Sequence, residues 1–271
     1  MNSYYVDVHA HLSDKDYADD RQQVIQRAVA SGLGAIVVNG TEPASNRAVL
    51  ALADEFAIVK PALGIYPVYA ALHKVANQAP YALEPFDLDE EISFIRTQAL
   101  ANKIIAVGEC GLDGHWLPGE ALPYQEEVFS QLIAIAHAAD LPIIVHTRKL
   151  ESRAMEMLAA AQIAKVVFHC FSGKANLAIN GAEKHGWHFS IPANAARHEG
   201  FQKLLKKLPA EALLTETDSP WLAPQPGTRN EPMNVVGTVA LLAKLRGLEV
   251  EAAQELVWKN YQRVFNKNFA K

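Results

Sequence analysis

Two histidines separated by one residue, His9 and His11, follow the first apolar run of the chain, Tyr4–Val8. Side chains of a β-strand alternate between its two faces, so an extended backbone directs both imidazoles to the same side. Imidazole nitrogens are ligands for divalent transition metals. A single His-x-His arises readily by chance in a chain with ten histidines. Its meaning therefore depends on whether the chain supplies further ligands at matching places.

Four more metal-competent side chains lie at the ends of later apolar runs, namely Glu109, His146, His169 and Asp218. They end or follow the fourth, fifth, sixth and eighth predicted strands. If these strands form one parallel barrel, their carboxyl ends converge on a single mouth, where the catalytic groups of such barrels collect. Taken singly, a buried His or Asp is more often a hydrogen-bonded core residue. The joint placement therefore carries the prediction of one metal site.

The elements that would position these side chains alternate along the chain. Short Val- and Ile-rich runs, typical of strands covered on both faces, lie at Tyr4–Val8, Gly34–Asn39, Ala57–Leu63, Ile104–Glu109, Pro142–His146, Val166–His169, His188–Ile191 and Leu213–Thr217. Helical patterns lie at Asp16–Ala30, Ser45–Phe56, Asp87–Ala101, Tyr124–Ala139, Glu151–Ala160, Ala175–Lys184, Glu199–Leu208, Val235–Arg246 and Val250–Phe265. Eight such repeats predict an α/β fold, a closed (β/α)8 TIM barrel, with a doubly wound open sheet as the alternative. No composition shift marks a boundary, so residues 1–271 are expected to form a single domain.

Composition limits the class of protein. Half of the residues are hydrophobic, which suffices for one large core at this length. No apolar run reaches the about 18 residues of a transmembrane helix, and two cysteines imply no disulfide framework, which together favour a cytoplasmic protein without a membrane partner. A formal net charge of −5 argues against broad nonspecific nucleic-acid binding and leaves room for a small basic site.

One segment, Pro67–Pro85, breaks the alternation of strands and helices because it contains several aromatic residues and no clear strand. It follows the third predicted strand and would lie over the catalytic end of a barrel. Long irregular insertions in compact domains are either functional lids or plain loops, and both alternatives stay open here.

Four ordered motifs of the chain resemble those of the TatD-type metal-dependent hydrolases, which are amidohydrolase-like barrels. The motifs are Asp7–His11, Gly108–Asp113, His169–Gly173 and Glu216–Leu222. The resemblance covers nearly the whole chain. It implies a barrel with a hydrolytic two-metal site at the carboxyl ends of the strands, in agreement with the ligand positions found above.

The resemblance also implies a role for each ligand. One divalent ion would be held by His9, His11 and Asp218, the other by His146 and His169, with Glu109 bridging the two. Asp218 would in addition orient or deprotonate the attacking water, so Asp218 and Glu109 would be the catalytic residues. Four imidazoles favour zinc or manganese over calcium, and the bridging carboxylate tolerates magnesium. Zinc, manganese and magnesium are therefore the expected ions.

Other residues are expected to support the ligands or to contact substrate. Asp7 shares a strand face with His9 and is expected either to accept an imidazole N–H or to bond to backbone. Arg148 lies on the same strand face as the histidine of the fifth strand and points further toward the mouth. Arg148, Tyr66 and Arg229 are expected to bind substrate, the two arginines through phosphate groups. The alternative for both arginines is an ordinary solvated surface cation.

The chain departs from the family pattern in two loops. The family's usual Gly-x-His-Pro appears as Gly64–Pro67, with Tyr66 in the histidine position. The aromatic residue usual after Gly-Leu-Asp is replaced by Gly114, two residues before Trp116. Both loops would face substrate, so the departures concern substrate choice and leave the metal ligands intact. Tyr66, Trp116 and Trp221 are expected either to stack a nucleobase or to pack the rim.

Three functions compete. The first is a TatD-like deoxyribonuclease that cleaves phosphodiester bonds of DNA, in single strands or at ends, with water activated by two metal ions. The second is a hydrolase of a small ester, amide or lactone at the same site. The third, a barrel that binds without chemistry, is disfavoured because all six ligand positions are filled. The deoxyribonuclease is the prediction, with DNA as the partner and no oligomeric state predicted.

Overall fold

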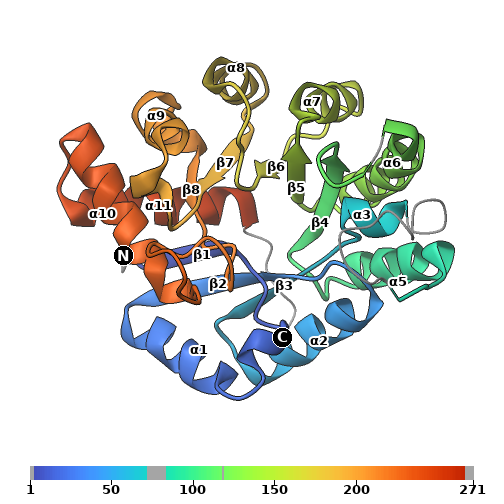
Figure 1. Cartoon of the computed structure of the whole chain (residues 1–271), viewed down its shortest axis with the longest axis horizontal. Helices are drawn as coiled ribbons and strands as arrows, with labels where there is room; N and C mark the ends of the chain where they lie inside the picture. Colours follow the sequence, from blue (N-terminus) through green and yellow to red (C-terminus); the bar gives the residue numbers. More distant parts are fainter. Residues whose placement is uncertain (1–2, 72–83, 118, 266–271) are drawn as a thin grey trace.

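Eight parallel strands form one sheet in which the spatial order follows the chain order (Figure 1). The computed structural model describes residues 3–71, 84–117 and 119–265. The strands are β1 Tyr5–Ala10, β2 Leu33–Asn39, β3 Val59–Leu63, β4 Ala106–Asp113, β5 Ile143–Arg148, β6 Val166–Phe168, β7 His188–Ile191 and β8 Leu213–Thr215. A parallel bridge between Ala10 and Ser219 returns the sheet to β1. The sheet is therefore a nearly closed barrel, which confirms the predicted (β/α)8 fold over the open sheet.

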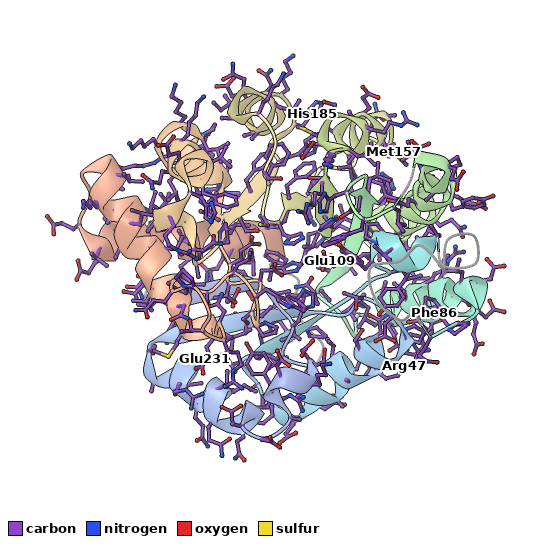
Figure 2. All side chains as sticks on the ribbon, viewed as in Figure 1. Arg47, Phe86, Glu109, Met157, His185 and Glu231 are labelled. Carbon is purple, nitrogen blue, oxygen red and sulfur yellow. The ribbon has the colours of Figure 1, made fainter. Side chains whose placement is uncertain are left out.

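Helices alternate with the strands and cover the outside of the barrel (Figure 1). The α-helices are α1 Arg21–Ala30, α2 Pro43–Glu55, α3 Pro67–Ala70, α5 Leu88–Leu100, α6 Leu122–Ala138, α7 Glu151–Ala160, α8 Ala175–His185, α9 Glu199–Lys207, α10 Val235–Arg246 and α11 Val250–Phe265. Short 3-10 helices are η1 Lys15–Tyr17, η3 Gly119–Ala121, η4 Ala195–Arg197, η5 Ala210–Ala212 and η6 Pro232–Asn234. Figure 2 places Glu109 near the middle of the ring of strands and Met157 and His185 on the outer helices.

Local chemistry fixes where the flanking helices begin and end. The carboxylate of Glu42 accepts the backbone N–H groups of Ala44 and Ser45, and the Ser45 hydroxyl accepts the N–H of Glu42, which forms a capping box at the start of α2. α8 ends at Gly186, whose φ of 69° suits the left-handed conformation that terminates a helix. These local signals set the start of α2 and the end of α8.

The fourth strand is longer than predicted, because β4 continues past Glu109 to Asp113. The residues beyond Glu109 pair with β5, with Gly111 opposite His146. A Cβ atom at Gly111 would lie 2.1 Å from the carbonyl oxygen of His146, so only glycine permits this close approach. The glycine interrupts the apolar run that marks the strand in the sequence. The prediction that Glu109 ends the strand is therefore wrong, and Glu109 and Asp113 both belong to it.

The end of the barrel near β1 and β8 is closed by backbone hydrogen bonds. The N–H of Asp218 donates to the carbonyl of His9 at 2.8 Å, and the N–H of His11 donates to the carbonyl of Ser219 at 2.8 Å. Because these bonds tie the segment after β8 to the end of β1, they carry Asp218 to the two histidines. The hydrogen bonds that close the barrel between β1 and β8 therefore also bring Asp218 next to His9 and His11.

The irregular segment Pro67–Pro85 begins with α3, and its residues 72–83 lie outside the described part of the chain. The choice between a lid and a plain loop therefore stays a prediction. Among the described residues, no helix has both the length and the apolar character that a bilayer crossing requires.

Candidate metal centre

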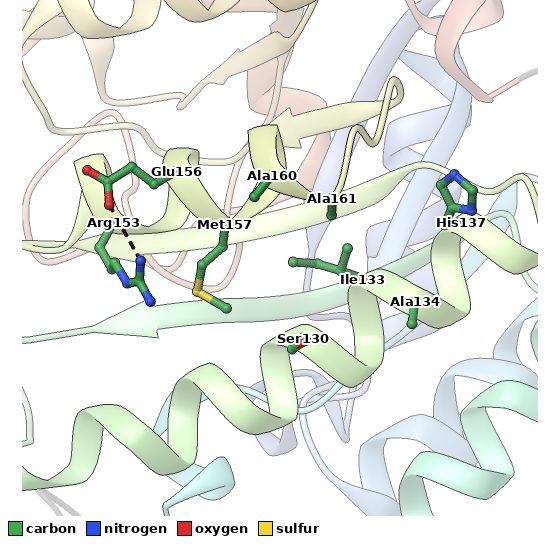
Figure 3. A pocket seen from close by; sticks show the side chains of 9 residues that line it. All are labelled: Ser130, Ile133, Ala134, His137, Arg153, Glu156, Met157, Ala160 and Ala161. Carbon is green, nitrogen blue, oxygen red and sulfur yellow. Dashed lines mark hydrogen bonds and ion pairs between the residues drawn. The ribbon is translucent and has the colours of Figure 1, made fainter.

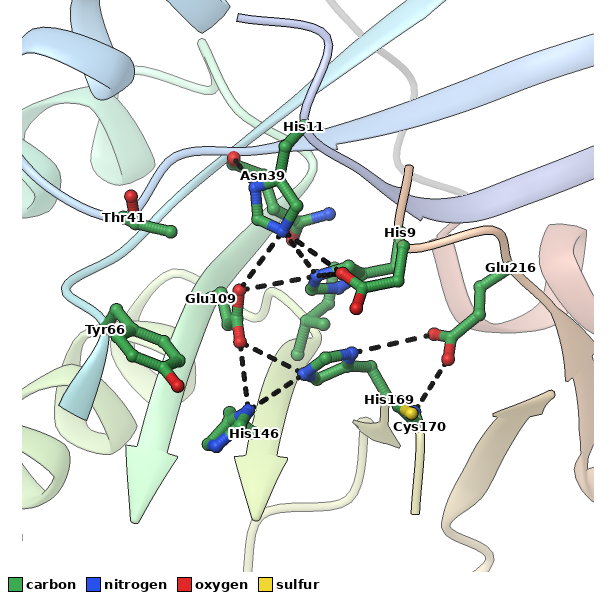
Figure 4. A network of polar contacts seen from close by, with 12 residues as sticks. His9, His11, Asn39, Thr41, Tyr66, Glu109, His146, His169, Cys170 and Glu216 are labelled. Carbon is green, nitrogen blue, oxygen red and sulfur yellow. Dashed lines mark hydrogen bonds and ion pairs between the residues drawn. The ribbon is translucent and has the colours of Figure 1, made fainter. Parts of the chain in front are cut away.

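The carboxyl ends of the strands bring all six predicted ligands together (Figure 4). They come from five strands or the residues directly after them: His9 and His11 from β1, Glu109 from β4, His146 from β5, His169 after β6 and Asp218 after β8. All but His146 and Asp218 are buried, and those two are only slightly exposed. The convergence on one mouth follows from the parallel barrel, as the sequence predicts.

One carboxylate oxygen of Glu109 faces the ligands from β1. Glu109 Oε2 lies 3.4 Å from Nε2 of both His9 and His11. Asp218 Oδ1 lies 3.5 Å and 3.4 Å from the same two nitrogens. The two nitrogens are 3.1 Å apart. Two imidazoles and two carboxylates thus point donor atoms at one small volume.

The other oxygen of Glu109 faces the ligands from β5 and β6. Glu109 Oε1 lies 3.2 Å from His146 Nδ1 and 3.0 Å from His169 Nε2. These two nitrogens are 3.2 Å apart. The side chain of Glu109 therefore stands between two groups of donors and offers one oxygen to each.

The spacing of the donors fits a bound cation. Ligand atoms about 2.0–2.2 Å from one ion are separated from each other by about 2.8–3.6 Å, depending on coordination geometry. The separations of 3.0–3.5 Å in both groups fall within this range. The nitrogens of His9 and His11, 3.1 Å apart, both point into the volume that such a cation would occupy. The described residues thus form donor groups that could hold a metal.

Two of the imidazoles are oriented through their far nitrogens. His11 Nδ1 lies 3.1 Å from the carbonyl oxygen of Asn39, and His146 Nε2 lies 2.9 Å from Asp113 Oδ2. A hydrogen bond donated by the far nitrogen fixes the tautomer and leaves the lone pair of the near nitrogen for a metal. Asp113 is not among the site residues that the sequence predicts. Strand alternation could have identified it, because it lies four residues after Glu109 on the same strand and therefore on the same face.

His169 is held differently. Its Nδ1 lies 3.9 Å from Glu216 Oε2, which is beyond hydrogen-bond length (Figure 4). Glu216 itself accepts the N–H of Cys170 at 2.7 Å and the hydroxyl of Ser190 at 2.5 Å. Burial raises the pKa of the Glu216 carboxyl well above its usual value. Glu216 therefore fixes the backbone beside His169 through a hydrogen bond, whereas it makes no hydrogen bond to the imidazole of His169.

The charges of the cluster depend on burial and mutual contact. Burial lowers the pKa of His9 to about 4. Burial would also lower the pKa of His11, but hydrogen bonds to Asp218 and Glu109 raise it to about 10. For Glu109, burial acts upward, yet His169 and the hydrogen bonds from His11 and the other imidazoles hold its pKa well below its usual range. The carboxylate is thus ionised at neutral pH, as a metal ligand must be.

Asp7 does not contact an imidazole. Its carboxylate accepts the backbone N–H groups of His9 at 3.2 Å and Thr217 at 3.0 Å, and the Thr217 hydroxyl at 2.5 Å. Burial raises its pKa to about 7 against these hydrogen bonds. Of the two expectations for Asp7, the structure shows the backbone bond, because the side chain lies one layer below the ligands and is too short to pass them. Asp7 joins β1 to the segment after β8.

Arg229 is engaged away from the cluster. Its guanidinium makes two hydrogen bonds to the carboxylate of Asp20, at 2.8 Å and 2.6 Å, and approaches Glu231 at 3.3 Å. It also lies 4.7 Å above the ring of Tyr17. These carboxylates balance the charge of Arg229, so the prediction that it binds substrate phosphate gains no support from the structure and stays a prediction.

The other predicted substrate residues lie beside the ligands. The ring of Tyr66 packs edge-on against His146 with centroids 4.9 Å apart, and its hydroxyl lies 3.4 Å from Asp113 Oδ2. The guanidinium of Arg148 lies 5.2 Å from the ring centroid of Trp116. Trp221 packs edge-on against His11 with centroids 5.2 Å apart. The rim of the cluster is therefore aromatic, with one arginine.

A surface groove also lies between α6 and α7 on the outside of the barrel (Figure 3). It is lined by residues such as His137, Arg153 and Met157. Arg153 pairs there with Glu126 at 2.6 Å and with Glu156 at 3.5 Å. Among the described residues, no member of the metal-competent cluster lines this groove, which is separate from the mouth of the barrel.

Comparison with known proteins agrees with this geometry. The model of the family "TatD related DNase" matches residues 6–266. The human protein named "Deoxyribonuclease TATDN3" is 31% identical over 268 residues, which cover 97% of this chain and 94% of the relative. A protein of Enterobacter lignolyticus named "3'-5' ssDNA/RNA exonuclease TatD" is 29% identical over 258 residues, with 90% and 92% covered.

A solved structure is similar over the same length. The crystal structure of YJJV, a TatD homologue from Escherichia coli K12, superimposes with a TM-score of 0.82 at 26% identity, covering 97% of this chain and 98% of the other. The family match covers nearly the whole barrel and includes all six predicted ligands. This chain therefore belongs to the TatD related DNase family.

Proposed function

We propose that this chain is a metal-dependent deoxyribonuclease that hydrolyses phosphodiester bonds of DNA with two divalent cations, residues 1–271 acting as one domain. The observation that carries the proposal is the position of Glu109 between two donor groups, with one oxygen 3.4 Å from His11 and the other 3.0 Å from His169. Family membership and the printed names of the relatives support nucleic acid as the substrate.

The assignment of ligands follows this division. His9, His11 and Asp218 would hold one cation, His146 and His169 the other, and Glu109 would bridge them. Zinc, manganese and magnesium suit the mixed donors, nitrogen from imidazole and oxygen from carboxylate. When bound, two such cations lower the pKa of water and neutralise charge that develops on the phosphoryl oxygens.

The residues of the chain supply the rest of the chemistry. The side chain of Asp218 is 16% exposed, against 4% for Glu109, so it is the carboxylate of the cluster that solvent reaches more easily. Its pKa lies below the usual value in spite of burial, because of the hydrogen bond with His11 and the neighbouring imidazoles. Asp218 would therefore orient the attacking water and accept its proton. Arg148 and Tyr66 would contact the substrate at the rim.

The experiment is reconstitution of activity. Protein stripped by a chelator is loaded with zinc, manganese or magnesium and given end-labelled single-stranded DNA, duplex DNA and RNA, beside a panel of small esters and lactones. We expect cleavage of DNA, preferably as single strands or from an end, and two bound ions per chain by elemental analysis. Glu109→Gln and Asp218→Asn must abolish the cleavage of DNA, a result that excludes a contaminating nuclease. If no nucleic acid is cut with any ion, the proposal fails, and hydrolysis of an ester or lactone would replace it.

A further inference from the structure

Two of the four tryptophans of the chain are exposed, and both lie next to the metal-competent cluster. Trp116 is 42% exposed and Trp221 is 52% exposed. Of the other two, Trp187 lies in the core, and Trp258 is partly buried and packs against Tyr4. Leaving large apolar rings in water is unfavourable. Exposed aromatic rings gathered at a site with chemistry therefore indicate a ligand surface.

Each of these tryptophans is fixed to a member or a direct partner of the cluster. The N–H of Trp116 donates to Asp113 Oδ1 at 2.8 Å, while Oδ2 of the same carboxylate bonds to His146 at 2.9 Å. The N–H of Trp221 donates to the carbonyl of Asp218 at 3.0 Å. These are backbone hydrogen bonds, so the main chain from which each ring projects is tied to the cluster. A side chain on a backbone that is already in place loses less conformational freedom when it binds a partner.

The two tryptophans lie on opposite sides of the mouth of the barrel. Trp116 follows β4, and Trp221 follows β8. The eight strands lie in chain order around the barrel, so strands four apart are on opposite sides. Trp116 lies on the side of His146, and Trp221 contacts His11, which belongs to the other donor group. The two tryptophans therefore bracket the pair of donor groups.

Among the described residues, an arginine lies over one of the two rings, that of Trp116. The Arg148 guanidinium lies over Trp116, and among the described residues it makes no ion pair or hydrogen bond. His115 packs edge-on against the same ring, with centroids 4.6 Å apart. A guanidinium above a ring keeps its N–H groups at the edge, where they can donate to a phosphate. This half of the mouth can thus receive a base and the phosphate attached to it.

We propose that Trp116 and Trp221 are the specificity-determining residues of the nuclease site, and that they stack the unpaired bases on either side of the cleaved phosphodiester. The inference rests on the proposed function and deepens it. Bases stack on aromatic side chains with little sequence preference, because every base has a π-face. A base held in a duplex cannot offer this face. The arrangement therefore favours single-stranded nucleic acid, because only unpaired bases can stack on the two rings. This stacking adds to the attraction between the phosphate backbone and the metal site.

The test compares two substrates that differ only in their bases. The position of cleavage is first mapped on a short single-stranded DNA. A second oligonucleotide of the same length carries abasic residues at the two nucleotides that flank that position. For Trp116→Ala and Trp221→Ala, we expect the ratio of kcat/KM for the base-containing over the abasic substrate to fall about tenfold or more each. Trp→Phe at either position restores part of the ratio, because a smaller ring still stacks.

Tyr4→Ala is the matched control. Tyr4 is also an exposed aromatic residue, 39% exposed, but it precedes β1 and so lies at the opposite end of the barrel. This variant leaves the ratio unchanged. Equal rates of the unaltered protein on both substrates, or tryptophan variants that slow both substrates equally, would overturn the proposal.

A second measurement separates this inference from the nuclease function. Binding of an oligonucleotide with non-hydrolysable methylphosphonate linkages is followed by quenching of tryptophan fluorescence. We expect quenching that decreases in Trp116→Phe and in Trp221→Phe. If the protein cleaves no nucleic acid, the proposed function fails. Quenching by this probe would still show that the two tryptophans stack bases. Absence of quenching overturns the stacking itself.

Discussion

Asp113 accepts a hydrogen bond from His146 Nε2 at 2.9 Å and thereby turns Nδ1 of that imidazole toward Glu109. The carboxylate is buried and receives the backbone N–H groups of His115 and Trp116 at 2.7 Å and 2.8 Å. Burial would raise the pKa of Asp113, but the bond to His146 and the two backbone donors lower it. The aspartate therefore stays ionised and links one ligand to the loop that follows β4.

We expect Asp113→Ala to weaken metal binding in one half of the centre only. Loss of the carboxylate that orients a ligating histidine commonly costs about 10- to 100-fold in metal affinity. Calorimetric titration of stripped protein should show one weakened equivalent of metal, assigned to the half with His146 and His169. The other half is oriented through the Asn39 carbonyl and His11, so it should keep its affinity. Equal weakening of both equivalents would contradict this division.

Glu109→Gln should remove metal from both halves, because a single side chain offers one oxygen to each. A neutral amide has the same shape but lacks the charge that balances two cations. We expect fewer than one ion per chain by elemental analysis and at least about a hundredfold loss of nuclease rate. Thermal unfolding in chelator should be similar for variant and parent. Retention of two ions by the glutamine variant would refute the bridging role.

The positions of the six ligands could be predicted from sequence because they depend on two simple regularities. Parallel strands of a barrel end at the same mouth, and residues two apart on a strand share a face. These regularities do not identify Asp113. Gly111 interrupts the apolar run before it, so the sequence pattern places the end of the strand at Glu109. The glycine reflects a contact with the His146 backbone, which is distant in sequence and has no local signature.

Arg229 shows a relationship that the sequence does not reveal. Its place in a loop after the last strand suggested a free phosphate-binding cation, but Asp20 lies 209 residues away in sequence and pairs with it in space. Which surface charges neutralise each other is decided by tertiary contacts between loops. The sequence therefore predicts the convergence of the strand-borne side chains, and it does not predict the ion pairs of the loop-borne arginine.

The two arginines give a matched pair of variants. Arg148→Met removes a guanidinium with no carboxylate partner among the described residues, and it keeps most of the apolar stem over Trp116. We expect KM for single-stranded DNA to rise about tenfold or more, the effect of losing one charged hydrogen bond. The slope of log Kd against log salt concentration should decrease by about 1, the value expected for the loss of one phosphate contact. Arg229→Met should leave KM and the salt slope unchanged, since its charge is already paired. Equal effects of the two substitutions would refute this distinction.

His188 gives a pH dependence that is separate from the metal centre. It opens β7 and is 8% exposed, and among the described residues neither of its ring nitrogens has a hydrogen-bond partner. Burial, reinforced by the charge of Arg263, lowers its pKa to about 4 from the 6.5 of a free imidazole. Between these two values the unfolded chain binds a proton that the folded chain refuses. Stability therefore falls as the pH drops from 6.5 toward 4.

His188→Leu should remove this dependence, because leucine does not titrate and leaves no buried nitrogen without a partner. In chelator-treated protein, we expect the unaltered chain to lose about 2 kcal/mol more than the variant in free energy of unfolding between pH 7.5 and pH 5. Urea unfolding at both pH values measures the difference. Groups of the metal centre titrate equally in both proteins and cancel in the comparison. Parallel pH profiles would show that His188 is protonated equally in the folded and unfolded chains.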